Sequence, residues 1–327
     1  MGTYIVRRLL SFIPTLFLIT VVGFIIMELP PGDYVDQYVR AETARGNLAA
    51  KDQAGVMRHE FGLDQPLPLQ YVTWMVRMVR GDLGNSFYYR EPVSKVIGDR
   101  LGATLIVSVI VFIVSWGIGI PLGVYSATHQ YSKADNFLTT VAFIGLGLPD
   151  FLIALVFLIF AWQLTGEVLT GLQSPQFLTA PWTLATLVDF LKHLWLPVTA
   201  VVITGMAWVM RVVRGNLLNE LGKNYVTALR AKGVPERTVV WKHAFRNSLH
   251  PLIGALGSVL SYLINGFTLT SIVLGLPTIQ SVYLTATLQQ DIYLAGTILT
   301  LIGVLVMLGN LISDLLLAWL DPRIRLG

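Results

Sequence analysis

The sequence predicts an all-α integral membrane protein with six transmembrane helices. Charged residues make up 13% of the chain, about half the share of roughly 25% that an ordinary soluble protein carries. The few charges are also segregated, because six long apolar stretches contain almost none of them. Each stretch approaches or exceeds the roughly 20 residues that a helix needs to cross the hydrocarbon core of a bilayer. A soluble protein would instead have shorter core helices with charge between them.

The expected spans cover residues 9–29, 101–127, 137–162, 194–213, 252–274 and 292–319. The first span follows two arginines, as a signal peptide would. Its apolar run exceeds the usual length of about 7–15 residues, however, and no small-x-small cleavage site follows Met27, so we expect an uncleaved helix. Prolines in or near the runs predict packed or water-lined surroundings, and they are Pro14, Pro121, Pro149 and Pro197. Gly119 and Gly123 have the spacing of a close helix contact.

Lysine and arginine in the short loops predict the orientation in the membrane. One side carries Arg7, Arg8, Lys133, the cluster from Arg211 to Arg246, Arg323 and Arg325. The opposite short loops contain only Lys192. We therefore predict that both termini and the loop after residue 213 lie in the cytoplasm. Because the basic excess lies mainly in one loop, it does not indicate a nucleic-acid partner, and the expected surroundings are membrane lipid.

The spans divide the chain into three parts. These are the N-terminal end with the first helix (1–30), a large extracytoplasmic segment (31–100) and a permease core (101–327) that includes a cytoplasmic loop (216–250). In the extracytoplasmic segment, apolar residues from Leu69 to Val79 form a helical stripe, and glycines at 81 and 84 end it. We interpret the stripe as an amphipathic helix in the membrane interface. A docking ledge for an external partner is the alternative.

The cytoplasmic loop is the most informative segment, and its residues 224–251 predict a helix, a break and a second helix. Gly233 suits a left-handed position after the first helix. Pro235 and Glu236 suit the first turn of the second, where proline lacks an N–H that needs a partner and the helix dipole favours an acid. Trp241 and Phe245 lie on an incomplete apolar face. Either this hairpin inserts into a groove on a partner protein, or it is a basic loop that only satisfies the positive-inside bias.

The same segment resembles the EAA loop of ABC importer permeases in the dipeptide/oligopeptide permease family. That form resembles Tyr-Val-x-Thr-Ala-Arg-Ala-Lys-Gly followed by His-Ala-Leu-Arg-Asn. The residues that match are Tyr225, Val226, Arg230, Ala231, Lys232, Gly233, His243, Ala244, Arg246 and Asn247. The sequence departs from the family at Ala228, Leu229 and Phe245. Similarity extends over nearly the whole chain, through Pro31-Gly32-Asp33, Phe61 to Pro66, Gly81 to Gly84, Gly119 to Gly123 and Leu320 to Arg323.

The resemblance implies the type I permease fold of ABC importers and a place in the bacterial plasma (inner) membrane. It also implies that the chain is half of a heterodimeric pore with a second homologous permease. Two ABC ATPase subunits bind below such a pore, and an extracytoplasmic solute-binding protein delivers solute above it. The residues expected to couple to an ATPase are Tyr225, Ala228, Ala231, Lys232, Gly233, Glu236, Arg237, Trp241, His243, Ala244, Phe245, Arg246 and Asn247.

Several kinds of chemistry are excluded from the chain itself. It contains no Gly-x-x-x-x-Gly-Lys-Ser/Thr nucleotide loop, so ATP and Mg are expected on the partner ATPases, and no catalytic residue or cofactor is expected here. The absence of cysteine excludes disulfides, thiolate metal sites and cysteine nucleophiles. His59-Glu60 is similar to part of a zinc-protease motif, but Leu63 occupies the position of the second histidine, so no metal site is predicted.

Two residues are expected on the translocation path. Asp150 lies near the middle of span 137–162, beside Pro149, and an intramembrane carboxylate suggests a functional site. The alternative is that it caps a helix beginning at residue 151. Ser271 occupies a position where many peptide-family permeases have an acidic residue. A third acid, Asp291, is expected to cap the last span.

The solute is the most open question. The resemblance favours peptides or similar oligomers. The runs Thr270 to Thr278 and Thr170 to Pro175 differ from the peptide branch, which leaves oligosaccharides or opines open. A stand-alone secondary transporter or channel is the alternative of another class, and a non-transporting scaffold is a third. A secondary transporter often shows inverted repeats and deep charges, whereas this sequence has no evident repeat and one deep acid.

Overall fold

The structure is a computed structural model that describes residues 2–320, and its regular elements in that range are all helices. Arg323 and Arg325, which contribute to the predicted orientation, lie outside the described residues. The chain forms two compact units. Unit 1 contains the chain up to Gly102 and Thr278–Leu305, and unit 2 contains Ala103–Pro277 and the chain from Val306 onward.

Within the described residues, four helices are long and apolar enough to cross a membrane. They are α1 (Gly2–Glu28), α5 (Val93–Thr128), α8 (Leu184–Leu221) and α16 (Ile292–Leu320). A bent pair, α6 (Lys133–Gly147) and α7 (Asp150–Thr165), passes the same test when the two helices are taken together. The chain is therefore an all-helical, multi-pass membrane protein with four or five such spans in the described part.

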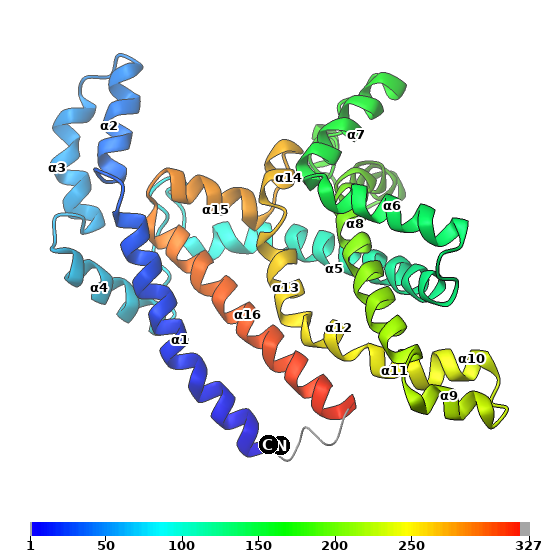
Figure 1. Cartoon of the computed structure of the whole chain (residues 1–327). Helices are drawn as coiled ribbons and strands as arrows, with labels where there is room; N and C mark the ends of the chain where they lie inside the picture. The colour runs from blue at the N-terminus through cyan, green and yellow to red at the C-terminus, as the bar shows by residue number, and fades with distance from the viewer. Residues whose placement is uncertain (1, 321–327) are drawn as a thin grey trace. The chain divides into compact units, whose positions relative to one another are not determined.

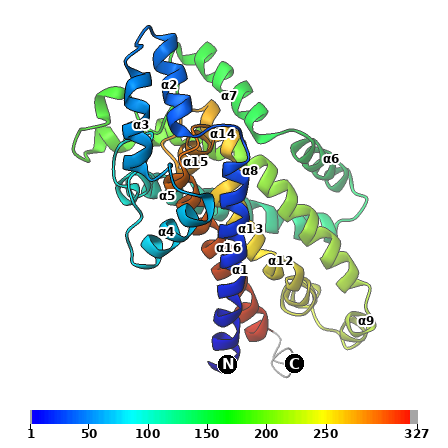
Figure 2. The ribbon, with the colours of Figure 1, turned by 90° about the vertical axis from the view of Figure 1, so that its left-hand side faces the viewer.

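In unit 1 the chain leaves α1 and enters three short helices, α2 (Tyr34–Ala44), α3 (Ala50–Phe61) and α4 (Leu67–Val79). Figures 1 and 2 show α2 and α3 side by side. Asp33 and Asp36 form a capping box at the start of α2. Arg58 of α3 donates to both carboxylates, at 2.7 and 2.5 Å, which ties the two helices together.

The amphipathic helix predicted around residues 69–79 is present as α4. Its buried side chain is Trp74, which is 3% exposed and stacks on Phe24 of α1 with ring centroids 6.3 Å apart. Leu69, Val72 and Val79 of the predicted stripe point outward and are exposed. This exposed apolar edge is what a helix lying in the membrane interface requires.

Asp291 caps α16, as predicted. Its carboxylate accepts from the Leu294 N–H at 3.2 Å, from the Ser86 hydroxyl at 2.5 Å and from the Tyr88 N–H at 3.1 Å. Because the side chain is buried, desolvation raises the pKa of Asp291. The acid thereby joins the loop that precedes α5 to the start of α16. The helix that immediately precedes α16 in the chain is α15 (Ile279–Leu288).

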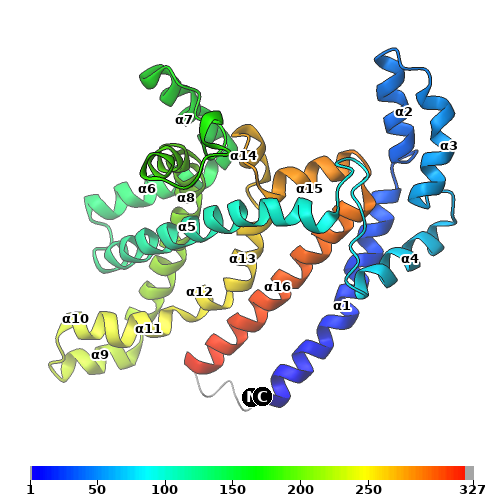
Figure 3. The same cartoon turned by 180° about the vertical axis from the view of Figure 1, so that it is seen from behind.

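In unit 2, α8 runs through the middle of a bundle with α5, α6 and α7 (Figure 3). Gly119 and Gly123 of α5 make the close helix contact predicted for them. A Cβ atom on Gly119 would lie 2.9 Å from the Met206 carbonyl oxygen, and one on Gly123 would lie 2.8 Å from the Met210 carbonyl oxygen. An ion pair joins Arg214 of α8 to Asp135 of α6, and the Asp135 carboxylate also accepts from Ser126 of α5. These contacts tie the three helices together.

Two predicted spans are not single helices. Span 137–162 breaks at Leu148 and Pro149, and α6 and α7 meet at 99°. Pro149 has no N–H to donate and forces Leu148 into an extended conformation, which ends the helix. Span 252–274 is divided into α12 (His250–Gly254), α13 (Leu256–Asn265) and α14 (Thr268–Val273). Glycines at the two breaks favour these interruptions.

The other four predicted spans each coincide with one helix, and the span 292–319 matches α16 (Ile292–Leu320) closely. The helix predicted at 101–127 begins at Val93, and the helix predicted at 194–213 extends from Leu184 to Leu221. The added residues of both helices include charged ones, so a search for charge-free apolar runs does not find them. Pro14, Pro121 and Pro197 lie inside continuous helices. A single-turn 3-10 helix, η1 (Pro175–Phe177), interrupts the loop between α7 and α8.

Candidate functional site

The segment 224–251 singled out in the sequence forms a helical hairpin at the end of α8 (Figures 1 and 3). Its first arm is α9 (Asn224–Ala231). Its second arm is helical from 236 to 248 and comprises α10 (Glu236–Thr238), the π-helix η2 (Val239–Ala244) and α11 (Phe245–Ser248). The predicted order of helix, break and helix is confirmed. We refer to residues 224–248 as the hairpin.

Gly233 forms the turn of the hairpin in a left-handed conformation, with φ of +75°. The Gly233 N–H donates to the Arg230 carbonyl at 2.9 Å and the Val234 N–H donates to the Leu229 carbonyl at 3.2 Å, which closes the end of α9. A Cβ atom at this position would meet no atom of the described residues within 4 Å. The conformation, and not crowding within this chain, is what requires glycine here.

An ion pair spans the turn and fixes the angle between the two arms. The Arg230 guanidinium donates to Glu236 through Nε at 3.0 Å and through Nη2 at 2.6 Å. This hydrogen-bonded arginine lowers the pKa of Glu236. Both side chains are about half exposed, so the pair contributes little free energy. Its two parallel hydrogen bonds instead favour one orientation of the Arg230 and Glu236 side chains.

The inner face of the hairpin packs on α8 through a buried apolar cluster. Val226, Val239 and Val240 lie in this cluster with Val213 and Leu217 of α8. Ala244 is also fully buried in it. Of the predicted coupling residues, Ala244 therefore supports the second arm from behind and does not reach the surface. This apolar cluster holds the hairpin against the end of α8.

A second tie joins both arms to the end of α8. The Tyr225 hydroxyl donates to Glu220 at 2.8 Å and accepts from the Asn247 amide at 3.3 Å. Burial raises the pKa of the Tyr225 phenol. Glu220 was not singled out from the sequence. A lone glutamate before a glycine gives no signal of this contact.

The outer face of the hairpin carries the other predicted residues. The exposed ones are Ala228, Ala231, Lys232, Gly233, Glu236, Arg237, Trp241, Arg246 and Asn247, and the half-buried ones are Tyr225, His243 and Phe245. Trp241 is 46% exposed, and its ring meets Phe245 edge-on with centroids 5.2 Å apart. A large, exposed, pre-oriented aromatic is the kind of residue that anchors protein interfaces.

A depression of about 300 Å³ lies between the two arms, lined by Tyr225, Ala228, Leu229, Lys232 and His243. Its lining combines apolar residues with Lys232 and His243, which carry side-chain nitrogens. Leu229, which departs from the family pattern, belongs to this lining. The depression suits an apolar side chain of a partner that carries acceptors around it.

The residues expected on the translocation path lie apart in the chain and differ in exposure. Asp150 is the first residue of α7, where its Oδ1 accepts from the Phe151 N–H at 2.9 Å. Its Oδ2 accepts from the Tyr262 hydroxyl at 3.4 Å. Asp150 thus lies at the start of a helix, at the break between α6 and α7, but Pro149 occupies the N-cap position and Asp150 does not cap α7. Ser271 of α14 is fully buried, and its hydroxyl has no partner among residues 2–320.

Metal binding finds no support in the described part of the chain. No group of three or more histidine, aspartate or glutamate side chains is placed there to hold an ion. His59 instead lies 2.8 Å from Asp64 in an exposed pair.

Comparison with known proteins identifies the family. Residues 119–326 match the family described as "Binding-protein-dependent transport system inner membrane component", and residues 1–109 match its N-terminal companion, "Binding-prot-dependent transport system membrane comp, N-term". The chain is 34% identical to the Bacillus subtilis (strain 168) "Oligopeptide transport system permease protein AppB", over 99% of this chain and 100% of the relative. It is 32% identical to the Sinorhizobium fredii "Probable peptide ABC transporter permease protein y4tP", over 99% and 100% respectively.

The Escherichia coli O157:H7 "Inner membrane ABC transporter permease protein YejB" is 30% identical, over 99% of both chains. The chain therefore belongs to the binding-protein-dependent transport system inner membrane component family and is an ABC transporter permease. Such a permease is one component of a larger system, so the alternatives of a stand-alone carrier and of a scaffold are set aside.

Proposed function

We propose that this chain is one half of the pore of an ABC importer and that its hairpin is the contact through which an ATPase subunit drives it. The single observation that supports this is a hairpin that packs on a 38-residue helix and carries an exposed Trp241 and a depression between its arms. The chain itself is a non-catalytic subunit without cofactors, and ATP and Mg bind to the partner ATPases. A second, homologous permease completes the pore as a heterodimer.

The proposed topology has six spans, with both termini in the cytoplasm. The bent pair α6 and α7 counts as one span, broken near its middle, and α12 to α14 count as another, interrupted at residues 255 and 266–267. Broken helices are tolerated at membrane depth where they are buried in protein or line a water-filled path. The segment 31–100 then lies outside, where an extracytoplasmic solute-binding protein delivers the solute.

The proposed solute is a peptide or a similar short oligomer. The names of the relatives support peptides. Oligosaccharides or opines remain the second candidate, because Ser271 replaces the acidic residue common in the peptide branch and Leu276 replaces a tryptophan. Transport of labelled peptides against labelled oligosaccharides by the reconstituted importer separates the two.

The coupling role is tested by co-purification. Trp241→Ala should weaken ATPase association, because truncating an aromatic anchor at an interface typically costs 2 kcal/mol or more. Trp182→Ala is the matched control, since Trp182 is 67% exposed and also meets a phenylalanine edge-on, with centroids 5.8 Å apart, but lies outside the hairpin. Equal ATPase recovery with both variants would refute the proposed contact.

A further inference from the structure

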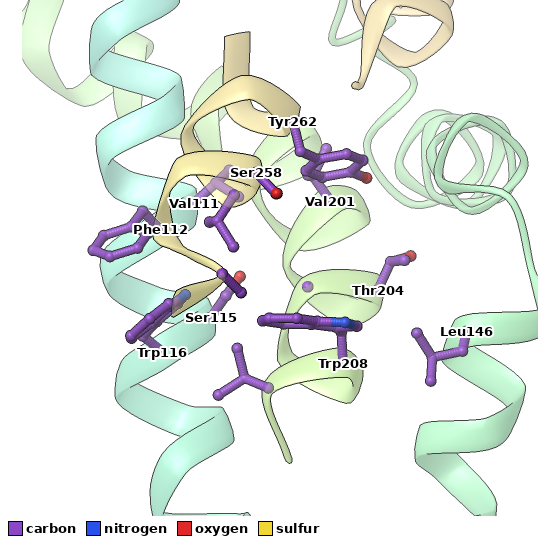
Figure 4. Close-up of a pocket in the computed structure, with 14 residues that line it drawn as sticks. Val111, Phe112, Ser115, Trp116, Leu146, Val201, Thr204, Trp208, Ser258 and Tyr262 are labelled. Carbon is purple, nitrogen blue, oxygen red and sulfur yellow. The ribbon is translucent and has the colours of Figure 1, made fainter. Parts of the chain in front are cut away.

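Unit 2 contains an open cavity of about 320 Å³ lined by residues of α5, α6, α8 and α13 (Figure 4). Four aromatic side chains line it, Phe112 and Trp116 from α5, Trp208 from α8 and Tyr262 from α13. Figure 4 shows Phe112 and Trp116 along one side and Tyr262 at one end. None of the described residues that line the cavity is charged. Its walls therefore suit an apolar group and exclude a charged one.

One polar group in the wall lacks a partner. Ser115 is 3% exposed, and its hydroxyl makes no hydrogen bond with any described residue. Gly205 of α8 packs closely against it, because a Cβ atom on Gly205 would lie 2.8 Å from the Ser115 Oγ. A buried hydroxyl without a partner costs free energy. Ser115 also lines the cavity, so a ligand there can supply the missing hydrogen bond.

A carboxylate lies one side chain away from the cavity. Tyr262 lines the cavity, and its hydroxyl donates to Asp150 at 3.4 Å. Asp150 is partly exposed and is therefore accessible to a cationic group. The region thus combines an aromatic cavity, an unpartnered hydroxyl and an adjacent acid. A peptide presents the complementary groups, which are an apolar side chain, a backbone amide and a free amino terminus.

We propose that this cavity is a subsite of the translocation path that accepts one aromatic or large aliphatic side chain of a peptide in transit. Ser115 hydrogen-bonds the peptide backbone and Asp150 attracts its amino group. The inference rests on the proposed peptide import. The volume lies near the lower end of the roughly 300–1,000 Å³ of ligand pockets, so it holds one side chain and not a whole oligomer. A lipid acyl chain would leave Ser115 without a partner.

The test compares uptake of two probe tripeptides, Ala-Phe-Ala and Ala-Ala-Ala, by the complete importer in proteoliposomes with its binding protein and ATP. Ser258 lines the cavity and is exposed, so Ser258→Phe fills the space without crowding the core. The ratio of Ala-Phe-Ala to Ala-Ala-Ala uptake should fall roughly tenfold, because burial of the phenyl group is lost. Ser261→Phe, on the same helix but outside the cavity lining, is the matched control and should leave the ratio unchanged.

A second variant separates a ligand role from a structural one. Ser115→Ala removes a hydroxyl that the protein does not satisfy, so the thermal stability of the complex should stay the same or rise. Uptake of both tripeptides should nevertheless fall several-fold, because the peptide backbone loses its hydrogen bond. Lower stability with unchanged uptake would overturn the proposed role of Ser115.

The outcomes also distinguish this inference from the proposed function. If the wild-type importer takes up both tripeptides and Ser258→Phe leaves their ratio unchanged, the subsite is wrong and peptide import stands. If the wild type takes up neither, both fail. A tripeptide with photoreactive benzoylphenylalanine in place of phenylalanine should crosslink to residues that line the cavity during transport. Crosslinking of this probe to lipid alone would show that the side chain in transit does not enter the cavity and would overturn the proposal.

Discussion

Gly233 offers the sharpest test of the coupling proposal, because its two possible roles predict opposite orders of the same variants. The residue has φ of +75°, and a Cβ atom there would meet no described atom within 4 Å. Its first possible role is to allow the left-handed turn. Its second is to leave room for an ATPase surface that approaches the backbone closely. Gly233→Ala adds strain but little bulk, whereas Gly233→Asn adds bulk but little strain, since asparagine tolerates this conformation.

The expected size of the effect follows from the conformation. A non-glycine residue in the left-handed region costs roughly 1–2 kcal/mol, and coupling between linked sites is typically about 1–3 kcal/mol, or roughly 5- to 150-fold. If the turn alone matters, Gly233→Ala should lose more coupling than Gly233→Asn. If close approach matters, the order reverses. Gly233→Asp adds a charge to the bulk and should still insert and pair with the second permease while losing ATPase binding or solute-stimulated hydrolysis.

The assay is ATPase co-purification together with solute-stimulated ATP hydrolysis by the reconstituted complex. Gly222→Ala provides a matched control, because Gly222 lies close to the hairpin in the chain, at the end of α8, with an ordinary φ of −80°. A Cβ atom there would make only ordinary contacts, at 3.8 Å from the Asn219 and Leu218 carbonyls. Full ATPase association and transport by all three Gly233 variants would show that the hairpin only anchors the topology.

Three further predictions concern the membrane topology, the role of Asp150 in uptake and the buried carboxyl group of Asp291. Cysteines at Ser94 and Gln176, both exposed, should react with an impermeant maleimide from outside and a cysteine at Thr238 should not; outside labelling at Thr238 would reverse the orientation. Asp150→Asn should reduce uptake several-fold without reducing assembly, because the amide cannot attract a cationic group, and unchanged uptake would leave Asp150 a structural residue. Burial raises the pKa of Asp291 above its ordinary 3.8, so the folded protein binds this proton more tightly and loses stability as pH rises from 3.8 through the raised pKa. Asp291→Asn should reduce the fall in melting temperature of the complex as pH rises above 3.8. An unchanged slope would contradict the raised pKa of Asp291.

The parts of the fold that the sequence predicted are those governed by local rules. Apolar runs free of charge located α1, α5, α8 and α16, and Gly233 with Pro235 located the turn of the hairpin. Asp291 was recognised as a cap from its place before an apolar run. In each case a short stretch of chain determines the outcome, because a bilayer requires length and apolarity and a turn requires a particular φ.

The parts that the sequence did not predict depend on contacts between distant segments. Pro149 was noted, but whether a proline bends a membrane helix depends on its neighbours, and Pro121 and Pro197 are accommodated without a break. The π-helix from Val239 to Ala244 has no marker in the residues themselves. Its i→i+5 period brings Val239 and Ala244 onto the same buried face, so Ala244 is a support and not a contact.

The position of α8 suggests how the hairpin and the cavity are connected. This helix has 38 residues and is therefore about 57 Å long. Trp208 lines the cavity near its middle, and the hairpin is fixed to its end through Val213 and Leu217. Between these points, Arg214 pairs with Asp135 of α6, and the same carboxylate accepts from Ser126 of α5. A displacement of the hairpin would therefore move Trp208 together with parts of α5 and α6, because no flexible segment separates them along α8. The residues proposed to contact an ATPase and those that line the proposed solute path are thus joined by one continuous helix.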